Sequence, residues 1–159
     1  MNLTTPEIRI EISFGDTVEP DWADRELIQS WVINALPADL DGGEIDVRIC
    51  DKPEMRDINR RFAGKDYATN VLAFPAQIDA AVPARMLGDI LICAPVVDTE
   101  AREQNKTRQQ HLAHMLTHAV LHLLGFDHQT VEEAERMESR EVTLLQNLGF
   151  PDPYASSGQ

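Results

Sequence analysis

The sequence predicts one domain of the mixed α/β class, in which a single mixed sheet of about four strands packs against about five helices. Its 159 residues are 43% hydrophobic, which is the size and composition of one compact domain with a single core. The hydrophobic periodicity predicts the order strand, helix, strand, helix, two strands and three helices. We expect the domain to span residues 1–153 and residues 154–159 to form a disordered tail.

The first strand and the first helix are predicted from two different hydrophobic periods. Apolar side chains alternate with polar ones from residue 8 to residue 14, which is the pattern of a half-buried strand. Between residues 22 and 36 the apolar positions recur at helical spacing instead, and Pro37 ends that helix.

A second strand at residues 44–50 is followed at once by a second helix. The strand places its alternate apolar residues on one face, and Asp51 with Pro53 has the composition of a helix start. We expect the buried stripe of this helix to consist of Met55, Ile58 and Phe62.

Two short strands and three helices complete the predicted chain. The strands lie at residues 70–74 and 87–93, and a loop rich in alanine and proline separates them. The helices are predicted at about residues 95–103, 108–124 and 131–148, and Thr130 and Gly149 are candidate caps of the last one.

The overall charge restricts the partners of the protein. A formal net charge of −13 and a pI near 4.6 repel phosphate backbones at long range, which disfavours non-specific binding of nucleic acid. Any RNA partner would therefore be held by a local basic patch, by a metal ion or by another protein.

The N-terminal sequence and the lengths of the apolar stretches lead us to expect a cytoplasmic protein. The N-terminus lacks the basic start and apolar run of a signal peptide, and no apolar stretch has the length of a membrane span. We expect no membrane interaction. Cys50 and Cys93 each end an apolar run, which is typical of small buried side chains, so neither a disulfide nor a cysteine metal site is expected.

A metal site is predicted from the spacing of three histidines. His118 and His122 are four residues apart, so on a helix both imidazoles leave the same face. Gly125 can turn the chain back and bring His128 to the same ion. Three histidines leave a fourth tetrahedral position for water, which distinguishes a catalytic zinc site from a structural one. We predict one Zn²⁺ ion used for hydrolysis, although three imidazoles also accept nickel, cobalt or copper.

Two other interpretations of the histidines stay open. Residues 111, 114, 118 and 122 could form an ordinary solvated face of one helix. Alternatively, His114 could be the third ligand, since it precedes His118 by one helical turn. We favour His128, because a helix and the turn that follows it enclose an ion better than three residues along one helix.

The same spacing occurs in the metzincin pattern H-E-x-x-H-x-x-G-x-x-H, with one difference. Ala119 stands where those proteases carry the glutamate that acts as general base. A metal hydrolase of metzincin type acting on amide bonds is therefore an alternative function that Ala119 disfavours.

The histidine motif and three further segments resemble the YbeY family of bacterial endoribonucleases. The family hallmark H-x-x-x-H-x-x-x-x-x-H corresponds to the three histidines of the predicted metal site. GKDYATNVLAFP at residues 64–75 is similar to the family segment that begins G-K-D. LGDILIC at residues 87–93 and LGFPDPY at residues 148–154 are similar as well, so the resemblance covers nearly the whole chain.

This resemblance implies a zinc-dependent endoribonuclease specific for single-stranded RNA. It also implies roles in maturation of the 3′ end of 16S rRNA and in ribosome quality control. The implied partners are the small ribosomal subunit, one of its proteins and the Era GTPase. The sequence leaves open whether a water or a ribose 2′-hydroxyl attacks the phosphorus. A third functional alternative is a metal-stabilised ribosome-binding factor with weak intrinsic activity.

The sequence departs from the family pattern at Ala63, where the family usually carries an arginine that acts on RNA beside the metal. A fixed guanidinium there would share with the metal the negative charge that builds on the phosphate oxygens. Arg60 and Arg61 in the preceding predicted helix are the candidate catalytic replacements. Lys65 and Arg85 are candidate substrate-binding residues, with solvated loop charges as the alternative interpretation.

Overall fold

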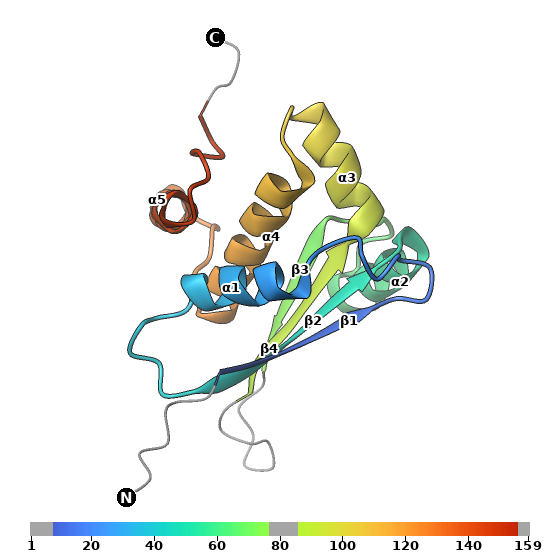
Figure 1. The fold of residues 1–159 in the computed structure, drawn as a ribbon, viewed down its shortest axis with the longest axis horizontal. Coiled ribbons are helices and arrows are strands. Elements are labelled where there is room, and N and C mark those ends of the chain that lie inside the picture. Colours follow the sequence, from blue (N-terminus) through green and yellow to red (C-terminus); the bar gives the residue numbers. More distant parts are fainter. Residues whose placement is uncertain (1–7, 77–85, 156–159) are drawn as a thin grey trace, which may run out of the picture.

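The computed structural model describes residues 8–76 and 86–155, and these form one sheet and five helices (Figure 1). The order along the chain and the mixed α/β class are as predicted from the sequence. In the described residues, no helix is both long and apolar enough to cross a membrane. The elements are β1 (Ile8–Phe14), α1 (Arg25–Ala35), β2 (Gly43–Cys50), α2 (Lys52–Ala63), β3 (Val71–Pro75), β4 (Met86–Cys93), α3 (Ala94–Glu103), α4 (Arg108–Leu123) and α5 (Val131–Asn147).

The sheet combines three parallel strands with one antiparallel strand at its edge. Its order is β1-β2-β4-β3. β2 pairs in parallel with both β1 and β4, so the chain makes crossover connections that contain α1 and α2. β3 pairs antiparallel with β4 and forms the edge that lines the cavity described below.

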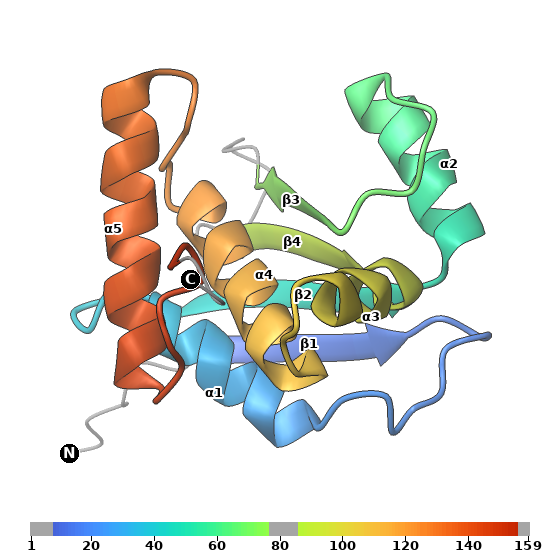
Figure 2. The same ribbon diagram turned by 90° about the horizontal axis from the view of Figure 1, so that it is seen from above.

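The helices cover the two faces of the sheet unequally. α1 and α4 pack on one face with α5 against α4, and α2 lies over the other face near β4 (Figure 2). The first face is wholly apolar along the central strands, where Ile45, Val47 and Ile90 are buried. The second face carries Asp46 and Asp89, which pair in register on neighbouring strands. The hydrophobic core therefore lies between the sheet and α4.

The two cysteines are buried, as the sequence predicts. Cys50 and Cys93 end β2 and β4, pair in register and are buried as free thiols. Burial raises the pKa of both thiols, so they stay protonated and act as small apolar side chains.

The first helix begins later than its hydrophobic pattern predicts. Trp22 is buried, but it precedes the helix and its indole N–H donates to Asp98 at 2.9 Å. The helix begins at Arg25 because Asp24 is its N-cap and accepts the backbone N–H groups of Glu26 and Leu27. The capping side chain, rather than the first apolar residue, thus sets the helix start.

The predicted apolar stripe of α2 is wrong at Phe62. Met55 is buried as expected, whereas Phe62 is 70% exposed and meets the ring of Phe74 edge-on, with 5.7 Å between the ring centroids. The buried residue near the end of α2 is Asn59, whose amide donates to the carbonyl oxygen of Tyr67 at 2.9 Å. A polar residue is buried there because it holds the loop that follows the helix.

The prediction that the disordered tail begins at residue 154 is wrong for Tyr154. The hydroxyl of Tyr154 donates to Glu141 at 2.7 Å, and the ring of Phe150 meets Trp31 edge-on at 5.8 Å between centroids. The segment after α5 is therefore tied back to the domain through Tyr154. Residues 156–159 lie outside the described residues.

Gly88 in β4 is a point of close approach between β3, β4 and α4. Its φ of +148° is a conformation that side-chain-bearing residues rarely adopt. A β-carbon at this position would lie 2.4 Å from the carbonyl oxygen of Phe74 and 2.7 Å from Cδ2 of Leu123. The first of these atoms belongs to the backbone of β3, so it could not move without disturbing the edge strand.

Gly88→Ala is expected to lower the free energy of unfolding by about 2–4 kcal/mol, since overpacking and backbone strain act together. Gly43→Ala is the matched control, because its new β-carbon would meet Cδ1 of Leu87, which is the end of a flexible side chain. Denaturant unfolding of both variants measures the two losses. Equal losses would contradict the explanation given for Gly88.

Candidate functional site

The two ends of α4 position the histidines of the site. At the start of the helix the side chain of Thr107 accepts the N–H of Gln110, whose side chain accepts the N–H of Thr107 in return. Past the end of the helix Gly125 adopts a φ of +98°, which turns the chain back as predicted. The residues that follow Gly125 therefore lie close to the last turns of the helix.

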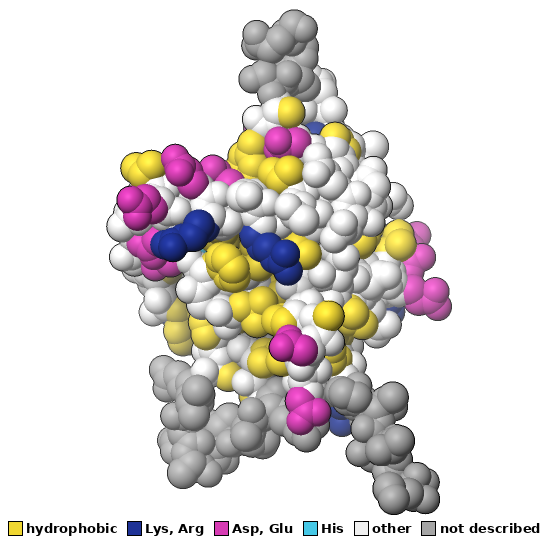
Figure 3. Space-filling model, turned by 90° about the vertical axis from the view of Figure 1, so that its left-hand side faces the viewer, with side chains coloured by type: hydrophobic (Ala, Val, Ile, Leu, Met, Phe, Trp, Pro, Cys, Tyr) yellow, Lys and Arg dark blue, Asp and Glu magenta, His cyan; other side chains and the backbone are white. Residues whose placement is uncertain are grey.

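A cavity of about 470 Å³ lies between α4, β3 and the C-terminal end of α2. Among the described residues, its lining contains one lysine, Lys65, and no carboxylate. His118, His122 and His128 also line it. On the side of the molecule shown in Figure 3, which carries α5, no histidine is visible among the described side chains.

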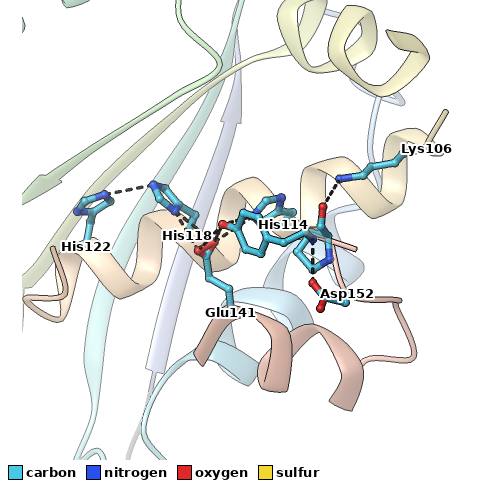
Figure 4. A network of polar contacts seen from close by, with 8 residues as sticks. Lys106, His114, His118, His122, Glu141 and Asp152 are labelled. Carbon is cyan, nitrogen blue, oxygen red and sulfur yellow. Dashed lines mark hydrogen bonds and ion pairs between the residues drawn. The ribbon is translucent and has the colours of Figure 1, made fainter. Parts of the chain in front are cut away.

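The three imidazoles of the cavity lie next to one another. The ring centroids are 4.7 Å apart for His118 and His122, 5.1 Å for His122 and His128, and 5.9 Å for His118 and His128. The Nε2 atoms of His118 and His122 face each other at 3.2 Å (Figure 4). Two tetrahedral ligands of one zinc ion are about 3.3–3.4 Å apart, so this pair has the spacing of two such ligands.

Asp127 is a fourth potential ligand. His122, Asp127 and His128 bring ligand atoms within 4.8 Å of one another, so the described residues contain a group that could hold a metal ion. However, Oδ1 of Asp127 accepts the backbone N–H of His128 at 2.7 Å, which is a common role of aspartate in a turn. Two sets of ligands for one metal ion are therefore possible. One is His118, His122 and His128, and the other is His122, Asp127 and His128.

The protonation state of His122 suits metal binding. Burial lowers the pKa of its ring, and the neighbouring His118 and His128 lower it further. The ring therefore stays neutral and keeps a lone pair available near neutral pH, which is the form that binds a metal.

The interpretation of the histidines as a solvated face is wrong. His111 and His114 are only 2% and 8% exposed, and each has a carboxylate partner. Nε2 of His111 lies 2.8 Å from Glu100, and Nε2 of His114 lies 2.9 Å from Glu141. Both rings are thus part of the interior, and His114 is directed toward α5.

Glu141 and Tyr154 are residues of the site that were not predicted from the sequence. Glu141 on α5 is 0% exposed, and its carboxylate lies 3.2 Å from Nδ1 of His118 (Figure 4). Burial opposes ionisation of Glu141, but hydrogen bonds from His114, His118 and Tyr154 outweigh it and lower the pKa to about 2. The available sequence signal was a charged residue within the apolar stripe of the last helix, whose buried members are Met137, Glu141, Leu144 and Leu145.

The predicted cationic residues occupy different places. Lys65 lines the cavity. Arg60 and Arg61 lie outside the lining and pair with Asp57 of their own helix at 2.8 Å and 3.3 Å. Arg85 lies outside the described residues.

Two alanines line the cavity at positions that matter for the alternative functions. Ala63, where the sequence resemblance leads one to expect an arginine, is at the C-terminal end of α2. Ala119, which stands at the position of the metzincin glutamate, is buried on α4 beside the histidines. These two positions therefore face the site but supply neither a guanidinium nor a general base.

Sequence comparison identifies related proteins across most of the chain. The family model described as Endoribonuclease YbeY matches residues 17–149. A protein named Endoribonuclease YbeY from Halorhodospira halophila is 45% identical over 148 residues, covering 91% of this chain and 96% of its own. A protein of the same name from Cellvibrio japonicus is 48% identical over 149 residues, covering 93% of this chain and 82% of its own.

A solved structure agrees with the fold. The solution structure of TM1509 from Thermotoga maritima matches with a TM-score of 0.52 and covers 94% of this chain and 99% of its own. Because the two sequences are 23% identical, this likeness supports the α/β fold alone.

Proposed function

This chain belongs to the YbeY family of endoribonucleases, and from that membership we propose a zinc-dependent endoribonuclease specific for single-stranded RNA. As a family member it is a hydrolase that cleaves RNA. We propose that it acts in maturation of the 3′ end of 16S rRNA and in ribosome quality control. The observation that carries the proposal is the convergence of three histidines in a cavity whose described lining is free of carboxylates.

The proposed zinc ligands are His118, His122 and His128. The 3.2 Å separation of Nε2 in His118 and His122 supports the first two, and His128 completes the set from the turn after Gly125. We prefer His118 to Asp127, because Asp127 already accepts a backbone N–H. A zinc ion held there would supply Lewis-acid stabilisation of negative charge on a phosphate and make a water more acidic. Nickel, cobalt and copper suit the same ligands, and metal analysis distinguishes them.

The cavity meets the electrostatic condition that the acidic sequence sets for RNA binding. The chain carries a net charge of −13, so RNA needs a local region that does not repel phosphate. The described lining offers Lys65 together with histidine, amide, hydroxyl and apolar side chains, with no carboxylate among them. We therefore assign phosphate contact to Lys65 and extend this proposed role to Arg85 from the sequence alone.

Arg60 and Arg61 are the weaker candidates for the role of the missing arginine. Both guanidiniums pair with Asp57, so either would have to leave that carboxylate to reach a phosphate in the cavity. Both are also more than half exposed, and breaking such ion pairs costs little. Their proposed catalytic role is tested against that of Lys65 below.

The described lining also bears on the alternative of amide hydrolysis. A metzincin-type peptidase needs a glutamate at the position of Ala119, and no other lining residue supplies a carboxylate in the described chain. We therefore do not propose amide hydrolysis.

We extend the proposal to location and partners on the basis of the family. The protein would work in the cytoplasm with the small ribosomal subunit, one of its proteins and the Era GTPase. Such partners would bring the RNA to a protein whose overall charge does not attract it.

Zinc-loaded protein is expected to cleave a labelled single-stranded RNA. Cleavage should fall to background after chelation and in His118→Ala, because both treatments remove the proposed metal centre. Gln129→Ala is the matched control, since Gln129 is an exposed residue in the same turn as His128 and should keep full activity. The metal content of every sample is measured together with the cleavage rate.

The outcome that contradicts this proposal is a wild-type protein with one equivalent of metal and no cleavage. That result would favour the ribosome-binding factor, and binding to small subunits by folded His118→Ala would support it further. Cleavage that survives complete removal of the metal would refute the zinc dependence.

Lys65→Met is expected to lower the cleavage rate by about 10²-fold, because it removes a cation that would stabilise charge on the phosphate. Arg60→Met and Arg61→Met are the comparison variants and should leave the rate nearly unchanged. Single-turnover rates on the same RNA measure all three. A larger loss in either arginine variant than in Lys65→Met would reverse the assignment.

A further inference from the structure

We propose that Glu141 is a positioning residue that fixes His118 in its metal-binding tautomer, and that Tyr154 holds the Glu141 carboxylate in place. The inference rests on the proposed function, because it takes His118 as a metal ligand. Neither Glu141 nor Tyr154 belongs to the cavity lining. In this proposal both residues act on His118 from outside the cavity.

The Glu141 carboxylate determines which nitrogen of His118 carries the proton. An ionised carboxylate accepts hydrogen bonds and donates none. Because its Oε2 lies 3.2 Å from Nδ1 of His118, the neutral ring carries its proton on Nδ1 and has a lone pair on Nε2. Nε2 is the atom that faces His122 across 3.2 Å (Figure 4). The carboxylate thus directs the free lone pair into the cavity.

Two further groups contact the same carboxylate. The hydroxyl of Tyr154 donates to Oε1 of Glu141 at 2.7 Å, and Nε2 of His114 lies 2.9 Å from the same oxygen. Nδ1 of His114 is buried with no hydrogen-bond partner among the described residues, which fits a proton on Nε2. Three donors therefore converge on one carboxylate and keep it from rotating away from His118.

Stability alone does not explain a carboxylate at this position. Glu141 lies in the apolar stripe of α5, where an apolar residue would pack without the cost of burying a charge. A carboxylate behind a metal-ligating imidazole fixes the orientation of the ring and makes the ligand nitrogen more basic. The geometry at His118 matches that second role.

Tyr154 connects the C-terminal segment to the metal ligand. Its backbone N–H donates to Asp152 at 2.8 Å, and Lys106, which precedes the N-cap of α4, donates to the carbonyl oxygen of Pro153 at 3.4 Å. Figure 4 shows Lys106 and Asp152 on the far side of His114 from His122. The segment therefore influences the metal site through Glu141 while lying outside the cavity.

The test compares Glu141→Gln and Tyr154→Phe with Glu135→Gln, an exposed glutamate on the same helix. Competition with a chromogenic chelator measures the dissociation constant for Zn²⁺. Glu141→Gln is expected to weaken binding by about 10–100-fold, since outer partners of metal ligands have effects of this size. Tyr154→Phe should weaken it less, and Glu135→Gln should leave it unchanged.

Ring-nitrogen NMR of the metal-free proteins gives a readout that a purely structural role would not change. His118 should carry its proton on Nδ1 in the wild type and in Glu135→Gln. In Glu141→Gln the glutamine NH₂ group faces donors, so the His118 tautomers should become mixed. Circular dichroism establishes that each variant is folded.

Unchanged zinc affinity and an unchanged tautomer in folded Glu141→Gln would overturn the proposal. If that variant does not fold, a wild-type His118 protonated on Nε2, or unchanged affinity in Tyr154→Phe, would overturn it instead. The predicted losses of zinc affinity in a protein whose wild type cleaves no RNA would refute the proposed function and support this inference. Failure of the proposed positioning role can therefore be distinguished from failure of the proposed endoribonuclease function.

Discussion

The burial of α4 is the constraint on which the rest of the structure depends. This helix packs against the sheet, α1, α3 and α5, so polar side chains along it lie inside the protein and need partners. His111 finds Glu100, and His114 and His118 share Glu141. The last two turns of the helix line the cavity, where His122 stays neutral because of its burial. One buried helix thus supplies both the core of the domain and its candidate metal centre.

The distribution of charge follows from the same layered arrangement. In-register pairing of β1, β2 and β4 places Glu11, Asp46 and Asp89 in one row across the sheet. This row lies on the face opposite to α4, where burial and the neighbouring Asp46 raise the pKa of Asp89. The described cavity lining, by contrast, has Lys65 and no carboxylate. A strongly acidic protein can therefore present a locally neutral or basic site to an anionic substrate.

The sequence predicted what local patterns determine and missed what distant contacts determine. The order of the elements follows from periodicity, because each strand or helix buries its own apolar face. The helix α1 starts later than predicted because its N-cap is Asp24, which follows the apolar Trp22. Phe62 of α2 is 70% exposed, although it was predicted to belong to the buried stripe of that helix. The histidine motif could be recognised because His118 and His122 lie one helical turn apart and His128 follows shortly after the helix. Glu141 and Tyr154 reach the site from later segments, and no local spacing relates them to α4.

We infer that His118, oriented by Glu141, is one of three imidazole ligands of a zinc ion. The most direct test is a crystal structure of the zinc-loaded protein, with anomalous diffraction at the zinc edge to locate the ion. We expect one ion at about 2.0–2.1 Å from imidazole nitrogens of His118, His122 and His128, with Nδ1 of His118 still hydrogen-bonded to Glu141. An ion bound by His122, Asp127 and His128 without His118 would refute this assignment.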